Sequence, residues 1–189
     1  MPLWPWILAA VLLGFLLARL KAAQDRLKTL ERADPLTGAP NRKAFQEMAE
    51  GELERSRRSS RPLTVAHLDV DDFRALNARS GQAAGDELLK TMAETIRGRL
   101  RGTDRFARTG GDEFSLLLPE TGLSDAREPL EKIRLSLVEA ARARGWPVTF
   151  TIGAKTFVQT PRSVDEMLKE SAAMVASSKK IGKDRVEHA

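Results

Sequence analysis

The chain contains no cysteine, and this absence excludes a disulfide framework, a thiolate zinc site and an iron–sulfur cluster. Its two histidines, His67 and His188, are too few to suggest a histidine-ligated metal site. The sequence also lacks the phosphate-binding patterns GxxxxGKS/T and GxGxxG, so it does not support a P-loop or a Rossmann nucleotide site. Metal or nucleotide chemistry in this chain must therefore depend on oxygen ligands.

The residues that are present are typical of a globular protein. Of the 189 residues, 42% are hydrophobic and 30% are charged, and the length suits one ordinary domain with a short extension. A formal net charge of +5 favours an anionic partner, namely a nucleotide, a nucleic acid or an acidic membrane surface. A nucleic-acid binder is disfavoured, because the sequence has neither a recognition motif nor clustered aromatic residues.

The first 18 residues have no charged side chain, and the first charge is that of Arg19. An apolar segment of this length, with Trp4 and Trp6 near one end, predicts a single transmembrane anchor over residues 1–18. A cleaved signal peptide would carry basic residues before its apolar core, whereas here they follow it; a buried core helix is the plainer alternative. The positive-inside rule then predicts a single-pass protein of the inner membrane, with the rest of the chain in the cytoplasm.

Residues 19–33 continue without glycine or proline and predict a helical stalk. Leu20 and Leu27 are seven residues apart, and Ala23 and Leu30 repeat with the same spacing. This pattern is too short to establish a coiled coil, so a dimeric coiled coil and a monomeric helical stalk both remain open. A dimeric stalk would bring two copies of the next domain together.

A separate α+β domain is expected over residues 34–189, after the break at Pro35 and Gly38. Its pattern predicts the order α-β-α-α-β-β-α-β-α, which mixes hairpin and crossover connections and favours a sheet with helices on one face. The predicted helices include residues 42–53, 86–100, 124–144 and 164–178, and the predicted strands are residues 63–70, 105–108, 114–118 and 148–157.

Carboxylates gather where two of these strands end. Asp69, Asp71 and Asp72 close the first strand, and Asp112 and Glu113 occupy the tip of a glycine-rich hairpin. If strand and hairpin are neighbours, these carboxylates converge, and oxygen ligands without histidine or cysteine select Mg²⁺ or Mn²⁺. The spacing is typical of a metal-dependent phosphoryl or nucleotidyl transferase, while solvated acidic turns at strand ends are the alternative.

The hairpin tip, residues 110–114, reads GGDEF, which is the signature of the diguanylate cyclases. Further segments resemble that family's motifs in the same order: DPLTG followed by NR, DVDDFRALN, GD and KKIGKD, at residues 34–38, 41–42, 69–77, 85–86 and 179–184. Together they extend over residues 34–186. The predicted domain is therefore identified as a member of the GGDEF-domain diguanylate cyclase family.

The resemblance implies a fold and an activity. The fold would be similar to the nucleotide-cyclase catalytic domain and the polymerase palm, with an antiparallel-containing central sheet and surrounding helices. The activity would be condensation of two GTP molecules into cyclic di-GMP with release of two pyrophosphates, dependent on Mg²⁺ or Mn²⁺. Because each site holds one GTP, the resemblance also implies a homodimer, which the stalk would help to form.

The resemblance also assigns roles residue by residue. Asp69 and Asp112 match the metal-binding carboxylates, assisted by the backbone carbonyl of Val70, and Glu113 matches the residue that helps to activate the 3′-hydroxyl and contacts the metal. The other matches concern the nucleotide: Asn77 and Asp86 read the guanine edge, Lys179 and Lys183 hold the triphosphate, and Gly111 lets the backbone approach the substrate, where a side chain leaves no room.

Taken singly, some of these residues have simpler explanations. Asn77 could be a helix C-cap, Asp86 a helix N-cap, and Lys179 a solvated lysine on a terminal helix. Only the joint pattern of motifs favours their roles in a site.

Arg101 and Asp104 form an RxxD motif that resembles the family's inhibitory site for cyclic di-GMP. They lie nine and six residues before Gly110, which matches the family's spacing. Arginine suits both stacking on a base and bidentate binding of phosphate. Product inhibition is therefore expected, and an ordinary ion pair within the loop is the alternative.

The end of the chain departs from the family pattern. Ala172 and Ala176 stand where the family has Asp and Tyr, Lys183 replaces an arginine, and Asp184 replaces an asparagine. Because lysine lacks the bidentate geometry of arginine, reduced activity is one expectation. The alternative function is a catalytically weak domain that binds cyclic di-GMP as an effector or scaffold, although the intact carboxylates favour the enzyme.

Overall fold

The computed structural model describes residues 13–17, 19–21 and 32–189. The predicted anchor over residues 1–18 and the predicted stalk over residues 19–33 lie for the most part outside these ranges. Within them, no helix combines the length and the apolar character that crossing a bilayer requires. The anchor, the stalk and the membrane location therefore stay predictions.

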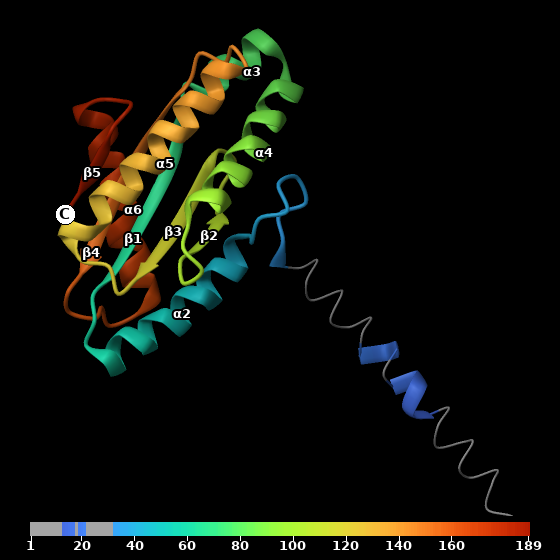
Figure 1. Ribbon diagram of the computed structural model, residues 1–189, viewed down its shortest axis with the longest axis vertical. Coiled ribbons are helices and arrows are strands. Elements are labelled where there is room, and N and C mark those ends of the chain that lie inside the picture. The colour runs from blue at the N-terminus through green and yellow to red at the C-terminus, as the bar shows by residue number, and fades with distance from the viewer. Residues whose placement is uncertain (1–12, 18, 22–31) are drawn as a thin grey trace, which may run out of the picture.

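A five-stranded sheet forms the centre of the domain, with the strand order β2-β3-β1-β4-β5 (Figure 1). Neighbouring strands are antiparallel, except that β4 and β5 are parallel. The strands are β1 (Leu63–Asp71), β2 (Arg105–Arg108), β3 (Glu113–Pro119), β4 (Thr149–Phe157) and β5 (Val186–His188). The helices are α2 (Arg42–Ser59), α3 (Phe73–Ser80), α4 (Gln82–Arg99), α5 (Leu123–Ala143) and α6 (Val164–Ile181). The predicted α+β class is confirmed.

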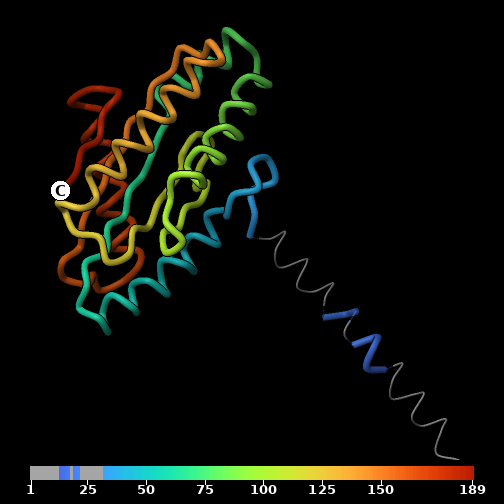
Figure 2. The backbone as a smooth tube through the Cα atoms, in the orientation of Figure 1, coloured from blue at the N-terminus to red at the C-terminus, as the bar shows by residue number. Residues whose placement is uncertain are grey.

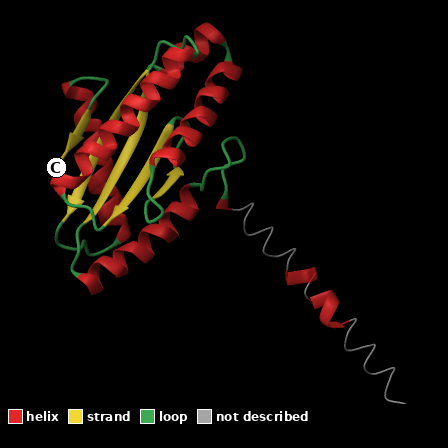
Figure 3. Cartoon of the chain, in the orientation of Figure 1, coloured by secondary structure: helices red, strands yellow, loops and turns green. Residues whose placement is uncertain are grey.

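Helices cover both faces of the sheet, because β1 is apolar on both of its sides. Ala66, Leu68 and Val70 pack with residues of α3, α4 and α5 in one core, whereas Leu63 and Val65 pack with residues of α2 and α6 in another. Figures 1 and 3 show α4 and α5 on the near side of the sheet and α6 on the far side. The prediction of helices on one face is therefore wrong, since a strand that is buried on both faces must be covered twice.

Several boundaries differ from the sequence-based prediction; for example, α2 ends at Ser59 rather than at residue 53. Helix α4 begins at Gln82 rather than at residue 86, and only Gly81, with φ 81°, separates it from α3. The short strand β5 was not predicted; its Val186 is the parallel register partner of Ile152 in β4. Figure 2 shows how the end of the chain returns to lie along the sheet. This return brings the segment after α6 to the same end of the sheet as the end of β1.

Candidate active site

Two carboxylates lie opposite each other where β1 ends. Asp69 and Glu113 are register partners in the antiparallel pair β1–β3, and Asp112 precedes Glu113 at the hairpin tip. The predicted meeting of strand end and hairpin is therefore confirmed. Burial raises the pKa of Asp69, and the charges of Asp112 and Glu113 raise it further, so the shift is upward although Lys179 opposes it. An acidic cluster of this kind is stabilised by added positive charge.

Lys179 in the last turn of α6 and Lys183 just after this helix supply part of that charge. The Lys179 ammonium forms an ion pair with Asp69, and the Lys183 ammonium lies 2.7 Å from Oδ1 of Asp72. The hydrogen bond to Asp72 raises the pKa of Lys183. Both predicted triphosphate ligands therefore lie at the same end of β1 as the predicted metal ligands.

The carboxylate cluster fits a divalent cation in its donor chemistry. Proteins commonly bind Mg²⁺ through one or two carboxylates, while water and substrate phosphates fill the other positions. Among the residues that the structure describes, no group of three or more acidic or histidine residues is gathered closely enough to hold a metal ion by itself. A cation here would need substrate oxygens as well. The Val70 side chain is buried in the core, so only its backbone carbonyl could take part.

A second part of the site is a pocket of about 330 Å³ between α3, α4 and the hairpin. Asn77 lies inside α3 and Asp86 lies inside α4, so neither residue caps a helix and the simpler explanations for them are wrong. Both predicted guanine-binding residues contribute to this one pocket, whose full lining is Phe73, Asn77, Gln82, Asp86, Leu89, Arg108 and Gly111.

The Asn77 side chain explains why a glycine precedes Asp86. A Cβ on Gly85 would lie 2.0 Å from Oδ1 of Asn77 and 3.1 Å from the ring of Phe73, so a side chain there would displace the asparagine. In the described part of the chain, Oδ1 of Asn77 is buried and has no hydrogen-bond partner. An unpaired buried acceptor costs about 1–3 kcal/mol, so a donor from a ligand or a water molecule would be stabilising here.

Arg108, the last residue of β2, braces the hairpin loop. Its guanidinium donates to both carboxylate oxygens of Asp34, at 2.9 and 3.0 Å, and to the carbonyl oxygen of Gly111, at 2.7 and 3.1 Å. Asp34 also accepts hydrogen bonds from the backbone N–H and the hydroxyl of Thr37. The DPLTG segment therefore holds the loop that carries the GGDEF residues.

Replacing Asp34 with asparagine is expected to lower the free energy of unfolding by about 1.5–3 kcal/mol at pH 7, because charge-assisted hydrogen bonds are lost. Burial alone raises the pKa of Asp34, but hydrogen bonds from Thr37 and Arg108 hold it below its usual value. The unfolded state therefore takes up this proton first, and the contribution is lost as the pH falls through the native-state pKa. Urea unfolding of both proteins should show a smaller difference at pH 3 than at pH 7. Equal differences would contradict this role.

The two glycines of the hairpin have different surroundings. A Cβ on Gly110 would lie 2.6 Å from a carboxylate oxygen of Glu113, so a side chain there would push Glu113 out of its position. At Gly111, beyond its chain neighbours, no atom of the described residues lies within 4 Å of the Cβ position. The predicted need for glycine at Gly111 therefore depends on the substrate alone and stays a prediction.

Asp184, one of the departures from the family pattern, is fixed from two sides. Its backbone is left-handed, with φ 56°, a conformation that Asn and Asp both tolerate. Its N–H donates to Asp71 at 3.0 Å, and its carboxylate pairs with Arg134 of α5. Asp71 is itself buried and accepts hydrogen bonds from Thr149 and Thr151 of β4. An aspartate in place of the family's asparagine is therefore compatible with a well-anchored loop around Lys183.

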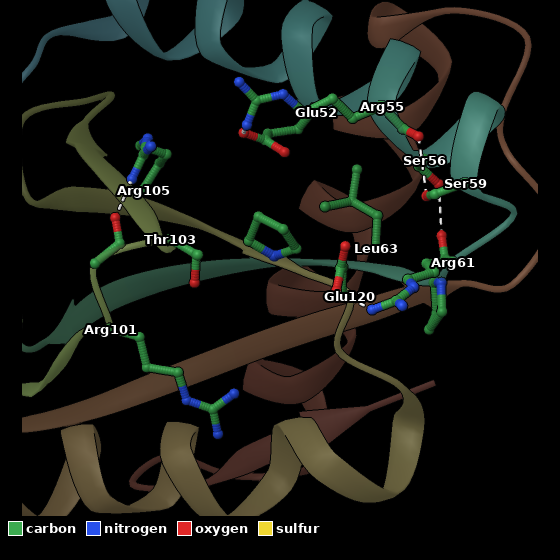
Figure 4. Close-up of a pocket in the computed structure, with 13 residues that line it drawn as sticks. Glu52, Arg55, Ser56, Ser59, Arg61, Leu63, Arg101, Thr103, Arg105 and Glu120 are labelled. Atoms are coloured by element: carbon green, nitrogen blue, oxygen red, sulfur yellow. Dashed lines mark hydrogen bonds and ion pairs between the residues drawn. The ribbon is translucent and has the colours of Figure 1, made fainter.

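Arg101 and Asp104 belong to a different region, where Arg101 borders a pocket of about 370 Å³ that Arg55, Arg61 and Arg105 also line (Figure 4). An Asp104 carboxylate oxygen accepts a hydrogen bond from the backbone N–H of Arg101 at 2.9 Å. Both side chains are described, and no ion pair joins them; the contact within the motif is this backbone hydrogen bond instead, and the inhibitory site stays a prediction. Figure 4 shows the Arg101 side chain extending away from Arg105 at the edge of the pocket.

One residue near the hairpin could not be selected from the sequence. His67 is largely buried on β1, with Nδ1 2.8 Å from Oγ of Ser115 and Nε2 2.8 Å from Oγ of Ser171. Burial lowers the pKa of His67 to about 4, so its ring is neutral at physiological pH. These partners lie 48 and 104 residues away along the chain, a distance at which no local pattern indicates a contact.

Residues 31–185 match the family model described as the diguanylate cyclase GGDEF domain, so the chain belongs to this family. It is 35% identical over 188 residues to the diguanylate cyclase DgcP of Pseudomonas aeruginosa, an alignment that covers 89% of this chain and 28% of DgcP. It is 33% identical over 174 residues to the cyclic di-GMP phosphodiesterase NbdA of the same organism, covering 91% and 22%. The chain thus spans less than a third of these two relatives.

Solved structures confirm the predicted fold. The diguanylate cyclase SiaD of Pseudomonas aeruginosa, in complex with its activator SiaC, has a TM-score of 0.77 at 30% identity, covering 99% of this chain and 73% of SiaD. The coiled coil and GGDEF domain of DgcB from Caulobacter crescentus, in complex with c-di-GMP, has a TM-score of 0.85 at 24% identity, covering 100% of both chains. At that identity, the second likeness establishes the fold only.

Proposed function

We propose that this protein is a diguanylate cyclase that joins two GTP molecules into cyclic di-GMP and releases two pyrophosphates. The observation that carries the proposal is the pairing of Asp69 with Glu113 across β1 and β3, with Lys179 held on Asp69 and the Asn77 pocket beside the same hairpin. Acidic, cationic and base-binding groups of this kind, gathered at one end of a sheet, suit a nucleotidyl transfer reaction.

Substrate binding rests on groups that the protein already holds close together. Asn77 and Asp86 form hydrogen bonds with the guanine edge, and Gly111 offers its backbone to the nucleotide. Lys179 leaves Asp69 to bind a phosphate, and Lys183 leaves Asp72 to bind a phosphate in the same way. Membership of a family that generally uses Mg²⁺ supports that ion as the partner of the carboxylates freed in this exchange.

In the reaction, the 3′-oxygen of one nucleotide attacks the α-phosphorus of the other, its proton passes to Glu113, and the bond to pyrophosphate breaks. The same step in the opposite direction closes the ring, so two GTP give one cyclic di-GMP and two pyrophosphates. Asp69, Asp112 and Glu113, with the carbonyl of Val70, would hold Mg²⁺, which would supply positive charge for the phosphate oxygens. Because one domain binds one GTP, the active form is a homodimer with two domains face to face.

A second candidate function concerns the pocket beside Arg101. Arg101 and the neighbouring arginines suit the two phosphates and the bases of cyclic di-GMP, which supports product inhibition at this pocket; Asp104, three residues after Arg101, does not line it. If turnover is weak, the same pocket would make the protein an effector or scaffold that binds cyclic di-GMP.

The proposal includes a location. The uncharged run over residues 1–18 and the basic residues after it support anchoring in the inner membrane, with the catalytic domain in the cytoplasm.

The test is product formation by the full-length protein in nanodiscs with GTP and Mg²⁺, followed by chromatography and mass spectrometry. Wild type is expected to make cyclic di-GMP, and Asp112→Ala is expected to lose at least about 100-fold in rate, as for removal of a charge-stabilising group. Arg101→Ala is the control, and it should keep making product after wild type slows. A parallel reaction with a phosphodiesterase removes product inhibition. No product from folded wild type that still binds cyclic di-GMP would favour the effector instead.

A further inference from the structure

Four polar side chains form a continuous hydrogen-bonded chain beneath the hairpin. Oγ1 of Thr109 lies 2.7 Å from Oγ of Ser115, and that oxygen lies 2.8 Å from Nδ1 of His67. On the other side of the ring, Nε2 of His67 lies 2.8 Å from Oγ of Ser171. The chain thus leads from the loop before the GGDEF residues, across β3 and β1, to helix α6.

The contacts of Ser171 assign the protons of this chain. Its hydroxyl lies 2.9 and 3.1 Å from backbone carbonyls one turn earlier in α6, which can only accept, so we assign its single proton to them and its oxygen as the acceptor of the Nε2–H of His67. The neutral ring then accepts at Nδ1 from the Ser115 hydroxyl, and Ser115 accepts from Thr109. His67 is therefore held as the Nε2–H tautomer, with both ring nitrogens in use.

The Thr109 end of the chain belongs to the loop whose backbone is bonded to that of Glu113. The backbone N–H groups of Thr109 and Gly110 donate to the carbonyl oxygen of Glu113, at 3.0 and 3.3 Å, and thereby close the loop. The position of the Thr109 side chain is therefore linked to the position of Glu113.

The Ser171 end belongs to the helix that carries Lys179. This helix lies directly on the sheet beside His67, because a Cβ on Gly153, the register partner of His67 on β4, would lie 2.3 Å from the backbone nitrogen of Val175. Contact this close leaves α6 little freedom to move across the sheet. The hydrogen bond from His67 therefore acts on a helix that is already tightly docked.

We propose that His67 is a positioning residue that fixes the hairpin carboxylates and Lys179 relative to one another, by holding the loop with one ring nitrogen and α6 with the other. The inference rests on the proposed cyclase function. An apolar side chain in place of His67 would fill the same space, but the loop and the helix would then be placed independently. One imidazole ring with a directed hydrogen bond at each nitrogen ties them together.

Matched variants of the full-length protein test this role. Thr109→Val removes the hydroxyl at similar volume, Thr109→Ser keeps it, and Ser171→Ala cuts the other end of the chain. Thr109→Val and Ser171→Ala are each expected to lower kcat about five-fold per folded protein, the effect of one lost hydrogen bond, with the KM for GTP little changed. Thr109→Ser should keep the wild-type kcat. The double variant should lose less than the product of the two single effects, because either cut already uncouples the loop from α6.

Two measurements do not need turnover. Long-range ¹⁵N correlation spectra of wild type should show the Nε2–H tautomer of His67, and amide exchange in α6 should be faster in Thr109→Val but not in Thr109→Ser. An Nδ1–H ring, unchanged α6 exchange in Thr109→Val, or multiplicative effects in the double variant would each overturn the inference. A wild type without cyclase activity whose α6 still responds to Thr109→Val would overturn the proposed function and support the coupling.

Discussion

Asp69→Asn is expected to reduce cyclic di-GMP formation by at least about 100-fold without lowering stability at pH 7. Burial and the charges of Asp112 and Glu113 raise the pKa of Asp69 above its unfolded-state value, against the effect of Lys179. The native state therefore binds this proton more tightly than the unfolded state does, so ionisation of Asp69 at neutral pH costs stability. The neutral amide of Asp69→Asn has the same shape as the carboxylate. It removes the cost in stability, and it also removes the negative charge on which the proposed activity depends.

Asp71, on the same strand, is the matched control. Its buried carboxylate accepts hydrogen bonds from the hydroxyls of Thr149 and Thr151 and from the N–H of Asp184. Asp71→Asn would turn an amide NH₂ toward these donors, so a loss of about 2–3 kcal/mol in unfolding free energy is expected. Urea unfolding and the product assay on both variants give the comparison. If Asp69→Asn is as unstable as Asp71→Asn, the cluster is structural rather than catalytic.

The difference between these two aspartates shows how far the sequence could predict the site. The strand end and the glycine-rich hairpin are local patterns, and they predict that Asp69 meets Asp112 and Glu113 only if strand and hairpin are neighbours, which the structure shows them to be. Local patterns alone could not separate Asp69 from Asp71, and only the motif match selected Asp69, because the hydroxyls that bind Asp71 come from a strand about 80 residues further along the chain. Burial of a carboxylate depends on its partners, which local patterns do not contain.

The fold shows the same limit at two helices. Taken singly, Asn77 and Asp86 are residue types that are common at helix caps, but α3 and α4 extend past both of them. Tertiary packing decided these boundaries, since the buried residues of α4 begin with Gly85, which packs against Asn77. The motif match identified both residues as nucleotide ligands, whereas the geometry alone shows only that they line one pocket.

The altered last helix is the remaining feature whose consequences the sequence left open, and Gly153 now offers a test. A Cβ at Gly153 would lie 2.3 Å from the backbone nitrogen of Val175 and 2.5 Å from the carbonyl carbon of Met174. These are backbone atoms, so no side-chain rotation relieves the clash and α6 itself must shift. Gly153→Ala is therefore expected to cost about 3 kcal/mol in unfolding free energy, as overpacking of a core commonly does.

Gly51→Ala is the matched control, because Gly51 is exposed in the middle of α2 and, apart from its chain neighbours and the nearby backbone of that helix, no atom of the described residues lies within 4 Å of its Cβ position. That variant should gain about 0.5–1 kcal/mol from helix propensity. Since a displaced α6 carries Lys179 away from Asp69, Gly153→Ala should also lose activity at temperatures where it is still folded, whereas Gly51→Ala should not. Urea unfolding and the product assay at 15 °C and 25 °C distinguish the two effects. A Gly153→Ala protein as stable and active as wild type would show that α6 does not need this contact to hold Lys179 in place.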